Sequence, residues 1–242
     1  MADVKEHYER VLSRVYSWML GGFEAALARN ADFFESHGVA APRRSGLAID
    51  LGAGCGFQSI PLAKLGYEVL AIDLDPQLLT ELGEHSEGLA IKCIEGDLLD
   101  FMRHVDREIE IAVCMTDTLL HLESTHDVKR MLGDIFASLG PGGRLFVTFR
   151  DLTRELEELD RFIPVRSDDD TIFTCFLEYE PDTVKVHDIV YERTGNTWNC
   201  SKSFYRKLRL SESRVVEELE KTGFSAVDAS DRGGLITIVA TK

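Results

Sequence analysis

Five short apolar segments alternate with longer segments of helical character through the middle of the chain. They span residues 47–51, 68–73, 89–94, 109–114 and 144–149. Short apolar runs separated by crossover helices are typical of a parallel sheet with helices on its faces. A helix over 211–222 and two strands, 225–229 and 235–241, follow near the end. The pattern predicts a doubly wound α/β fold.

The two flanks of this region have different periods. Apolar positions between Glu6 and His37 recur at helical spacing and are interrupted at Gly21-Gly22, which predicts two helices with a flexible joint. Beyond Arg150 apolar and polar residues alternate over 173–179, 183–191 and 197–210, with turn signals between them. This alternation predicts an antiparallel insertion of three or four strands.

One helix is marked at both ends. Ser124 can cap it with Asp127 three positions later, and Gly140-Pro141-Gly142-Gly143 should end it. We expect a single domain over residues 1–242. Its expected parts are an N-terminal helical cap (1–44), a core (45–150), an antiparallel insertion over the substrate side (151–210), and a final helix and strand hairpin (211–242).

Charge and composition exclude several classes of partner. The chain of 242 residues has a net charge of -15, so a phosphate backbone would be repelled, and we expect no nucleic-acid partner. No apolar run is long enough to cross a bilayer and the start lacks a leader pattern, which favours a cytoplasmic protein without membrane contact. Five scattered cysteines, and the pairs His121/His126 and His187/Asp188, give no metal set.

Candidate chemistry begins at the loop Asp50-Leu51-Gly52-Ala53-Gly54-Cys55-Gly56, which follows a strand and opens a helix. Glycines allow a ligand to approach the backbone closely, and amides at a helix start suit a carboxylate. Asp50 could accept a bond from an ammonium group, and Asp73, at the end of the next strand, could hold a ribose. A dinucleotide fingerprint needs a glycine where this chain has Phe57, which favours an adenosyl ligand.

These residues resemble motif I of the class I S-adenosylmethionine-dependent methyltransferases. Gly96-Asp97-Leu98 resembles the family's adenine-binding element, Cys114-Met115-Thr116-Asp117 is similar to motif IV, and 139–143 is similar to the turn before the fifth strand. The resemblance covers about 45–150 and implies a mostly parallel seven-stranded Rossmann-like sheet with an antiparallel last strand. More loosely, Gly56-Phe57-Gln58-Ser59 and Tyr16-Ser17-Trp18-Met19 are similar to the glycine N-methyltransferase branch, where an aromatic N-terminal segment covers the cofactor.

The resemblance implies S-adenosylmethionine as cofactor, S-adenosylhomocysteine as product, no metal, and a small-molecule methyl acceptor. A homodimer remains an open option. The expected cofactor residues are Tyr16, Asp50, Gly52, Ala53, Gly54, Gly56, Asp73, Leu74, Asp97, Leu98, Met115 and Thr116.

Methyl transfer needs a general base only when the acceptor must lose a proton. His121 and Asp117, just beyond the fourth strand, are the candidates. Each could instead have a structural role: His121 as a capping or hydrogen-bonded residue before the next helix, and Asp117 at the start of a turn. Tyr205 and Arg206 could reach an anionic acceptor, or the basic run that contains them could be a solvated strand edge. Methylation of RNA or protein, a nicotinamide-dependent oxidoreductase and a non-catalytic binder of the same cofactor are the alternatives.

Overall fold

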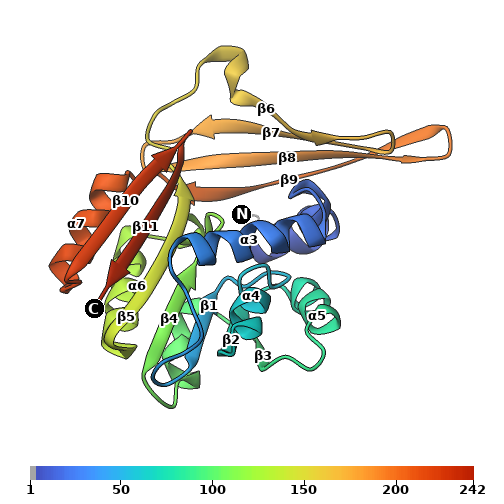
Figure 1. Ribbon diagram of the computed structural model, residues 1–242. Coiled ribbons are helices and arrows are strands. Elements are labelled where there is room, and N and C mark those ends of the chain that lie inside the picture. Colours follow the sequence, from blue (N-terminus) through green and yellow to red (C-terminus); the bar gives the residue numbers. More distant parts are fainter. Residues whose placement is uncertain (1–3) are drawn as a thin grey trace.

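The central feature of the computed structural model is a seven-stranded sheet in the order β10-β11-β5-β4-β1-β2-β3 (Figure 1). The structure describes residues 4–242, so the first three residues of the expected N-terminal cap lie outside it. Strands β3, β2, β1, β4 and β5 are parallel, and β11 is antiparallel to both of its neighbours. The strands are Leu47–Leu51 (β1), Glu68–Asp73 (β2), Ile91–Glu95 (β3), Ile109–Cys114 (β4), Leu139–Arg150 (β5), Ala226–Arg232 (β10) and Leu235–Thr241 (β11). The predicted fold class is confirmed.

Helices cover both faces of this sheet, which explains why its strands lack alternation. All five residues of β1 are buried. Apolar side chains of α3 and α4 pack on one face, and those of α6, α7 and a 3₁₀ helix after β3 pack on the other. The helices are Phe23–Ser36 (α3), Ser59–Lys64 (α4), Pro76–His85 (α5), Thr125–Ser138 (α6) and Glu212–Thr222 (α7), with 3₁₀ segments Leu98–His104, Thr118–His121 and Glu158–Arg161.

Strand ends differ slightly from the predicted ranges. β3 begins at Ile91, two residues later than expected. β5 begins at Leu139, immediately after α6 ends, because the chain pairs with β4 at Leu139, shifts register, and pairs again at Arg144. Residues 140–143 follow the end of α6, close to where the sequence predicted it. They form an irregular start of β5 instead of a separate turn.

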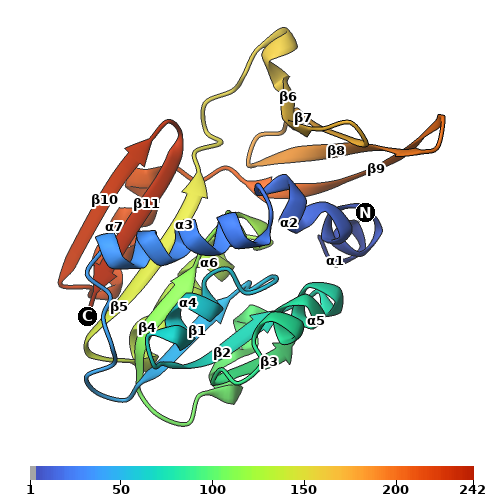
Figure 2. The same ribbon diagram turned by 45° about the vertical axis from the view of Figure 1, so that its right-hand side comes forward.

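The N-terminal segment is a chain of short helical turns that lies between the central sheet and the antiparallel sheet (Figure 2). It comprises Val4–His7 (α1), a π-helical turn Tyr8–Leu12, a 3₁₀ turn Ser13–Val15 and Tyr16–Met19 (α2). Gly21 and Gly22 follow at φ 97° and 95°, and α3 starts next. The break at these glycines agrees with the prediction, whereas the first of the two helices is irregular.

A separate four-stranded antiparallel sheet lies across the carboxyl ends of the central parallel strands (Figure 1). Its inner face is mostly apolar: alternate residues of β8 are buried, beginning with Val184 and Val186. β6, which shows no clear alternation, was not among the three predicted alternating segments. The strands are Phe162–Ser167 (β6), Thr171–Tyr179 (β7), Thr183–Thr194 (β8) and Thr197–Leu208 (β9).

Among residues 4–242, no helix has the length and apolar character needed to cross a bilayer.

The cap of α6 can be tested by replacing Ser124 with Ala. The Ser124 hydroxyl accepts a bond from the Asp127 amide at 3.2 Å, and loss of such a cap costs about 1 kcal/mol. We expect the free energy of unfolding of Ser124→Ala to be lower by this amount, measured by urea unfolding monitored by circular dichroism. Ser213→Ala is the control, because its exposed hydroxyl bonds only the Ser211 hydroxyl; equal losses in both variants would contradict the cap.

Candidate functional site

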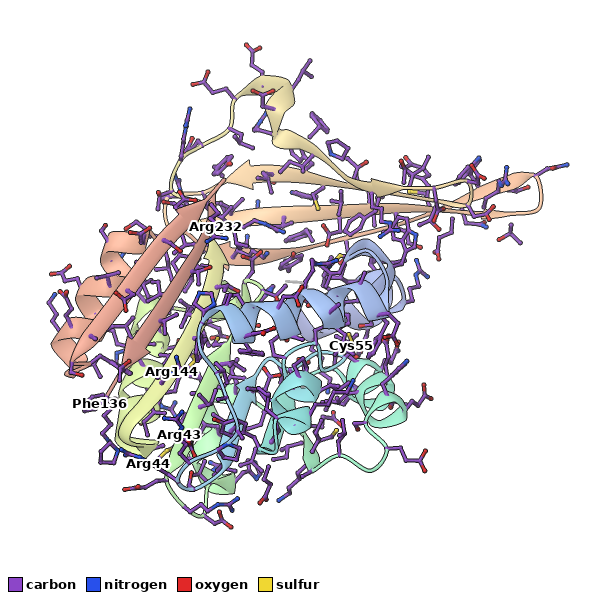
Figure 3. The ribbon with its side chains drawn as sticks, viewed as in Figure 1. Arg43, Arg44, Cys55, Phe136, Arg144 and Arg232 are labelled. Carbon is purple, nitrogen blue, oxygen red and sulfur yellow. The ribbon has the colours of Figure 1, made fainter. Side chains whose placement is uncertain are left out.

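The glycine loop after β1 is fixed by the end of β2. The amides of Gly52 and Ala53 both donate to the Ile72 carbonyl, at 2.9 and 3.0 Å. Gly56 has φ 89°, and a Cβ there would lie 2.1 Å from Leu82 Cδ1, so packing against α5 requires glycine. Between Gly54 and Gly56, Cys55 packs between α3 and α5 (Figure 3). The loop is therefore a rigid turn with little room for other residues.

A cavity of about 600 Å³, the glycine-loop cavity, opens beside this turn. Its walls come from the N-terminal segment and from the carboxyl ends of β1, β2, β3 and β4, where doubly wound sheets bind ligands. Of the twelve expected cofactor residues, seven line it: Tyr16, Gly52, Gly54, Asp73, Leu74, Leu98 and Thr116. His121, expected as a base, and Gly96, from the expected adenine-binding element, also line it. The residues on its wall that were not predicted are Val4, Lys5, Tyr8, Ile72, Asp75, Leu78 and Thr118.

Asp73 and Asp75 are carboxylates on the wall of this cavity, and Asp75 is occupied by the Ser13 hydroxyl and the amides of α5, so Asp73 is the one available to a ligand. The contacts of Asp73 are local. Its Oδ2 accepts a bond from the Gly54 amide at 2.7 Å, and its Oδ1 accepts one from the Asp75 amide at 2.9 Å. Burial raises the pKa of the Asp73 carboxyl, and these backbone bonds oppose the rise. Each oxygen keeps a further lone pair for a ligand hydroxyl.

Asp50 lies elsewhere than expected. Its side chain is only 1% exposed, lies outside the residues that line the cavity, and accepts a bond from the Ser59 hydroxyl at 2.7 Å. Burial raises the pKa of the Asp50 carboxyl to about 7. In this structure Asp50 therefore joins the end of β1 to the start of α4, instead of facing a ligand ammonium group.

Four other expected cofactor residues also lie off the cavity wall. Gly56 is occupied by its packing against Leu82, and Ala53 and Met115 are buried in apolar clusters. Asp97 caps the 3₁₀ helix after β3 by accepting a bond from the Leu99 amide at 2.8 Å.

A second cavity of about 1230 Å³, the insert cavity, lies beneath the antiparallel sheet. Most of its wall is apolar, with side chains from the N-terminal segment, β6, β7 and β8. Tyr8, Thr116 and His121 line both cavities, so the two spaces lie next to each other at these three residues, which we call the junction. Polar groups on the wall are Thr116, Asp117, His121, Arg150, Cys175, Asp188, Tyr205 and Lys207, with the phenol of Tyr8.

The turn after β4 carries an unusual backbone. Thr116 and Asp117 have φ 58° and 70°, a region that side chains other than glycine adopt at a cost of roughly 1–3 kcal/mol each. The Thr116 amide donates to the Thr148 hydroxyl at 2.8 Å, and the Asp117 amide donates to the Thr148 carbonyl at 3.1 Å. Such conformations cluster at functional sites, and this one directs Thr116 to the junction of the cavities.

Asp117 is bound to two cations, which argues against its expected role as a base. Lys207 Nζ lies 2.6 Å and Arg150 Nη1 3.1 Å from Asp117 Oδ2. Burial raises the pKa of the carboxyl, but Lys207 and Arg150 outweigh it and hold that pKa well below its usual range. A carboxylate of this kind is a poor proton acceptor.

His121 lies at the junction, but its environment makes it a weak base. Burial and the charge of Lys207 lower its pKa to about 3. Its ring stacks on Tyr205 at a centroid distance of 5.2 Å, and its buried Nδ1 has no hydrogen-bond partner within residues 4–242. The position agrees with the expected one, whereas the low pKa disfavours proton abstraction by this imidazole.

Strand alternation separates the two expected substrate residues. Tyr205 points inward and lines the insert cavity. Arg206 points to the opposite face, where its Nε donates to Glu180 Oε2 at 2.7 Å, and it lines neither cavity. Contrary to expectation, Arg206 therefore does not face the acceptor space; the next inward residue, Lys207, does.

Sequence reasoning overlooked Asp188 and Lys207, although a signal was present. Asp188 follows Val184 and Val186 in the buried phase of β8, and Lys207 follows Tyr205 in the buried phase of β9. A charged residue at an inward position of an amphipathic strand needs a buried partner or a ligand. That rule would have selected both residues.

Comparisons with known proteins agree with this geometry. Residues 48–143 match the model of a methyltransferase domain family. Over 112 residues the chain is 24% identical to the glycine/sarcosine N-methyltransferase of Aphanothece halophytica, a match that covers 46% of this chain and 42% of that relative. The match thus spans less than half of the relative's length.

Solved structures show the same fold over nearly the whole chain. The CcbJ methyltransferase of Streptomyces caelestis superposes with a TM-score of 0.75, 18% identity and coverage of 97% of both chains. The sugar N-methyltransferase KedS8 of Streptoalloteichus sp. ATCC 53650 gives a TM-score of 0.73, 13% identity, and coverage of 96% of this chain and 93% of that chain.

The sheet order and the placement of the glycine loop define a Rossmann-like methyltransferase fold. Together with the methyltransferase domain matched over residues 48–143, they make the chain similar to the class I S-adenosylmethionine-dependent methyltransferases.

The burial of Asp50 predicts a distinct pH dependence of stability. Its pKa is about 7 when folded and about 3.9 when unfolded, so the folded state holds the extra proton between these values. Stability from this group is present at low pH and falls as the pH rises from about 4 to 7, by up to about 1.4 kcal/mol per unit. Asp50→Asn should lack this loss.

The measurement is urea unfolding of both proteins at several pH values without ligand. We expect the stability of Asp50→Asn relative to the native protein to increase from pH 4 to 7. Asp228→Asn, on the exposed strand β10, is the control and should show one constant difference. A constant difference for Asp50→Asn as well would refute a buried, protonated carboxyl.

Proposed function

We propose that this protein transfers a methyl group from S-adenosylmethionine to a small-molecule acceptor bound in the insert cavity. The observation that carries the proposal is the junction of two cavities at Tyr8, Thr116 and His121. One cavity adjoins the glycine loop, and the other is enclosed by the antiparallel sheet. Methyl transfer needs a donor and an acceptor to meet at short range in a site shielded from water.

The glycine-loop cavity suits the adenosyl cofactor. It lies at the carboxyl ends of parallel strands, beside a glycine turn that lets a ligand approach the backbone closely. Asp73 would accept bonds from ribose hydroxyls, Leu74 and Leu98 would border the adenine, and the loop backbone at Gly52 and Gly54 would approach the amino-acid part. The bound cofactor supplies an electrophilic methyl group on a sulfonium sulfur.

The remaining residues of the site serve orientation and exclusion of water. The turn at Thr116 and Asp117 is fixed by Thr148, Lys207 and Arg150, so its position does not depend on a ligand. Tyr8 and Tyr16, from the N-terminal segment, cover the glycine-loop cavity. A preorganised site of this kind lowers the barrier to a displacement without a nucleophilic side chain.

An acceptor site beneath the antiparallel sheet favours a small molecule over RNA or protein. The net charge of -15 also opposes RNA, and the absence of the third fingerprint glycine opposes a nicotinamide cofactor. The relatives named as glycine/sarcosine and sugar N-methyltransferases support small acceptors. The large apolar wall of the insert cavity suits an acceptor with more carbon than glycine.

Titration calorimetry with S-adenosylmethionine, S-adenosylhomocysteine and a nicotinamide dinucleotide tests the cofactor assignment. We expect binding of the two adenosyl compounds alone. Asp73→Ala should weaken that binding at least tenfold, about 1.4 kcal/mol, because ribose hydroxyls lose their acceptor. Turnover with a panel of small acceptors then separates an enzyme from a non-catalytic binder.

Asp106→Ala is the control, since Asp106 is exposed and lies outside both cavities. Circular dichroism should show that both variants fold. If Asp73→Ala binds S-adenosylhomocysteine as tightly as the native protein does, the assignment of this carboxylate fails. Binding of the dinucleotide in place of the adenosyl compounds would favour an oxidoreductase.

A further inference from the structure

Asp188 is a buried carboxylate on the wall of the insert cavity. It lies on β8 in the inward row and is 1% exposed. Its Oδ2 lies 2.9 Å from His7 Nε2, and its Oδ1 accepts a bond from the Cys175 thiol at 2.8 Å. A buried carboxylate is costly unless it is paired or binds a ligand of opposite charge.

The charges around the insert cavity are unevenly balanced. Within the described part of the chain, the carboxylates on its wall are Asp117 and Asp188. Asp117 has both Lys207 and Arg150 within 3.1 Å, whereas Asp188 has only the imidazole of His7 as a basic partner. The part of the cavity wall around Asp117 therefore carries excess positive charge, whereas the part around Asp188 favours binding of a cation.

His7 is held in one orientation by its neighbours. Its side chain is fully buried, its ring lies 4.4 Å from the Tyr205 ring, and Nε2 faces Asp188. Nδ1 is buried without a hydrogen-bond partner within residues 4–242. With Nε2 as donor, this imidazole fixes the Asp188 carboxylate and leaves lone pairs on its oxygens for a ligand.

On the basis of the proposed function, we propose that the insert cavity binds an acceptor that carries an amino group on an apolar scaffold. Asp188 binds this group in its ammonium form, and His7 is the residue that positions Asp188. Lys207 and Arg150 are both paired with Asp117, which leaves Asp188 as the carboxylate for the ammonium group.

The chemistry of this step balances. The ammonium group gives one proton to an Asp188 oxygen, which leaves a neutral amine with a free lone pair. That lone pair forms the new nitrogen–carbon bond to the methyl group. The carbon–sulfur bond of S-adenosylmethionine breaks, its electron pair stays on sulfur, and the products are S-adenosylhomocysteine and a methylated ammonium group.

The test uses cyclohexylamine and cyclohexanol as matched probes, titrated by calorimetry into the full chain saturated with S-adenosylhomocysteine. We expect the native protein to bind the amine at least tenfold more tightly than the alcohol. Asp188→Asn should weaken binding of the amine at least tenfold and binding of the alcohol less than twofold. Glu178→Gln, a carboxylate outside both cavities that pairs with Lys185 on β8, should change neither.

If Asp188 had a purely structural role, Asp188→Asn would weaken the binding of both probes equally. That result would overturn the proposal. So would native protein that shows no preference for the amine, or does not bind it. If Asp188→Asn does not fold, His7→Phe keeps a ring against Tyr205 and removes the donor to Asp188. It should reduce the preference for the amine at least threefold, and an unchanged preference would refute the positioning role.

The same titrations separate this proposal from the function on which it rests. Native protein that does not bind S-adenosylhomocysteine would overturn the proposed methyl transfer, and the amine site with it. Normal binding of S-adenosylhomocysteine without amine preference would overturn the amine site alone.

Discussion

The site depends on the buried ion pair between Lys207 and Asp117. Lys207 belongs to the antiparallel sheet, and Asp117 belongs to the turn after β4 of the central sheet, 2.6 Å away. Loss of either partner would leave a buried charge without its main counterion, which is strongly destabilising. The pair therefore couples the position of the inserted sheet to the left-handed turn that presents Thr116 to both cavities.

The N-terminal segment is joined to both sheets by polar contacts of the same kind. His7 contacts Asp188 of the antiparallel sheet, and the Ser13 hydroxyl donates to Asp75 Oδ2, beyond β2, at 2.5 Å. Between these contacts lies Tyr8, which lines both cavities. The walls of the glycine-loop cavity and of the insert cavity thus share the same short segment, and hinge motion at Gly21-Gly22 would change both together.

Much of the central fold could be predicted because its signals are local. The ranges of β1, β2, β4 and β11 follow from apolar runs, and Ser124 marks the start of α6 as expected. Asp73 and Gly54 were found because the carboxyl ends of parallel strands meet at one edge. Asp50 was expected at the cavity by the same rule and Asp97 from the family resemblance, but local contacts to Ser59 and the Leu99 amide turn their side chains away.

The sequence by itself determined the succession of strands and helices in the central fold and the position of the glycine loop, and it predicted an adenosyl cofactor. These depend on hydrophobic period, on turn residues and on spacing within a few tens of residues. Only the tertiary structure decided which charges meet: Lys207 is paired with Asp117, and Asp188 with His7, across separations of 90 and 181 residues. Electrostatic pairing and burial depend on distance in space, and no local pattern along the chain encodes that distance.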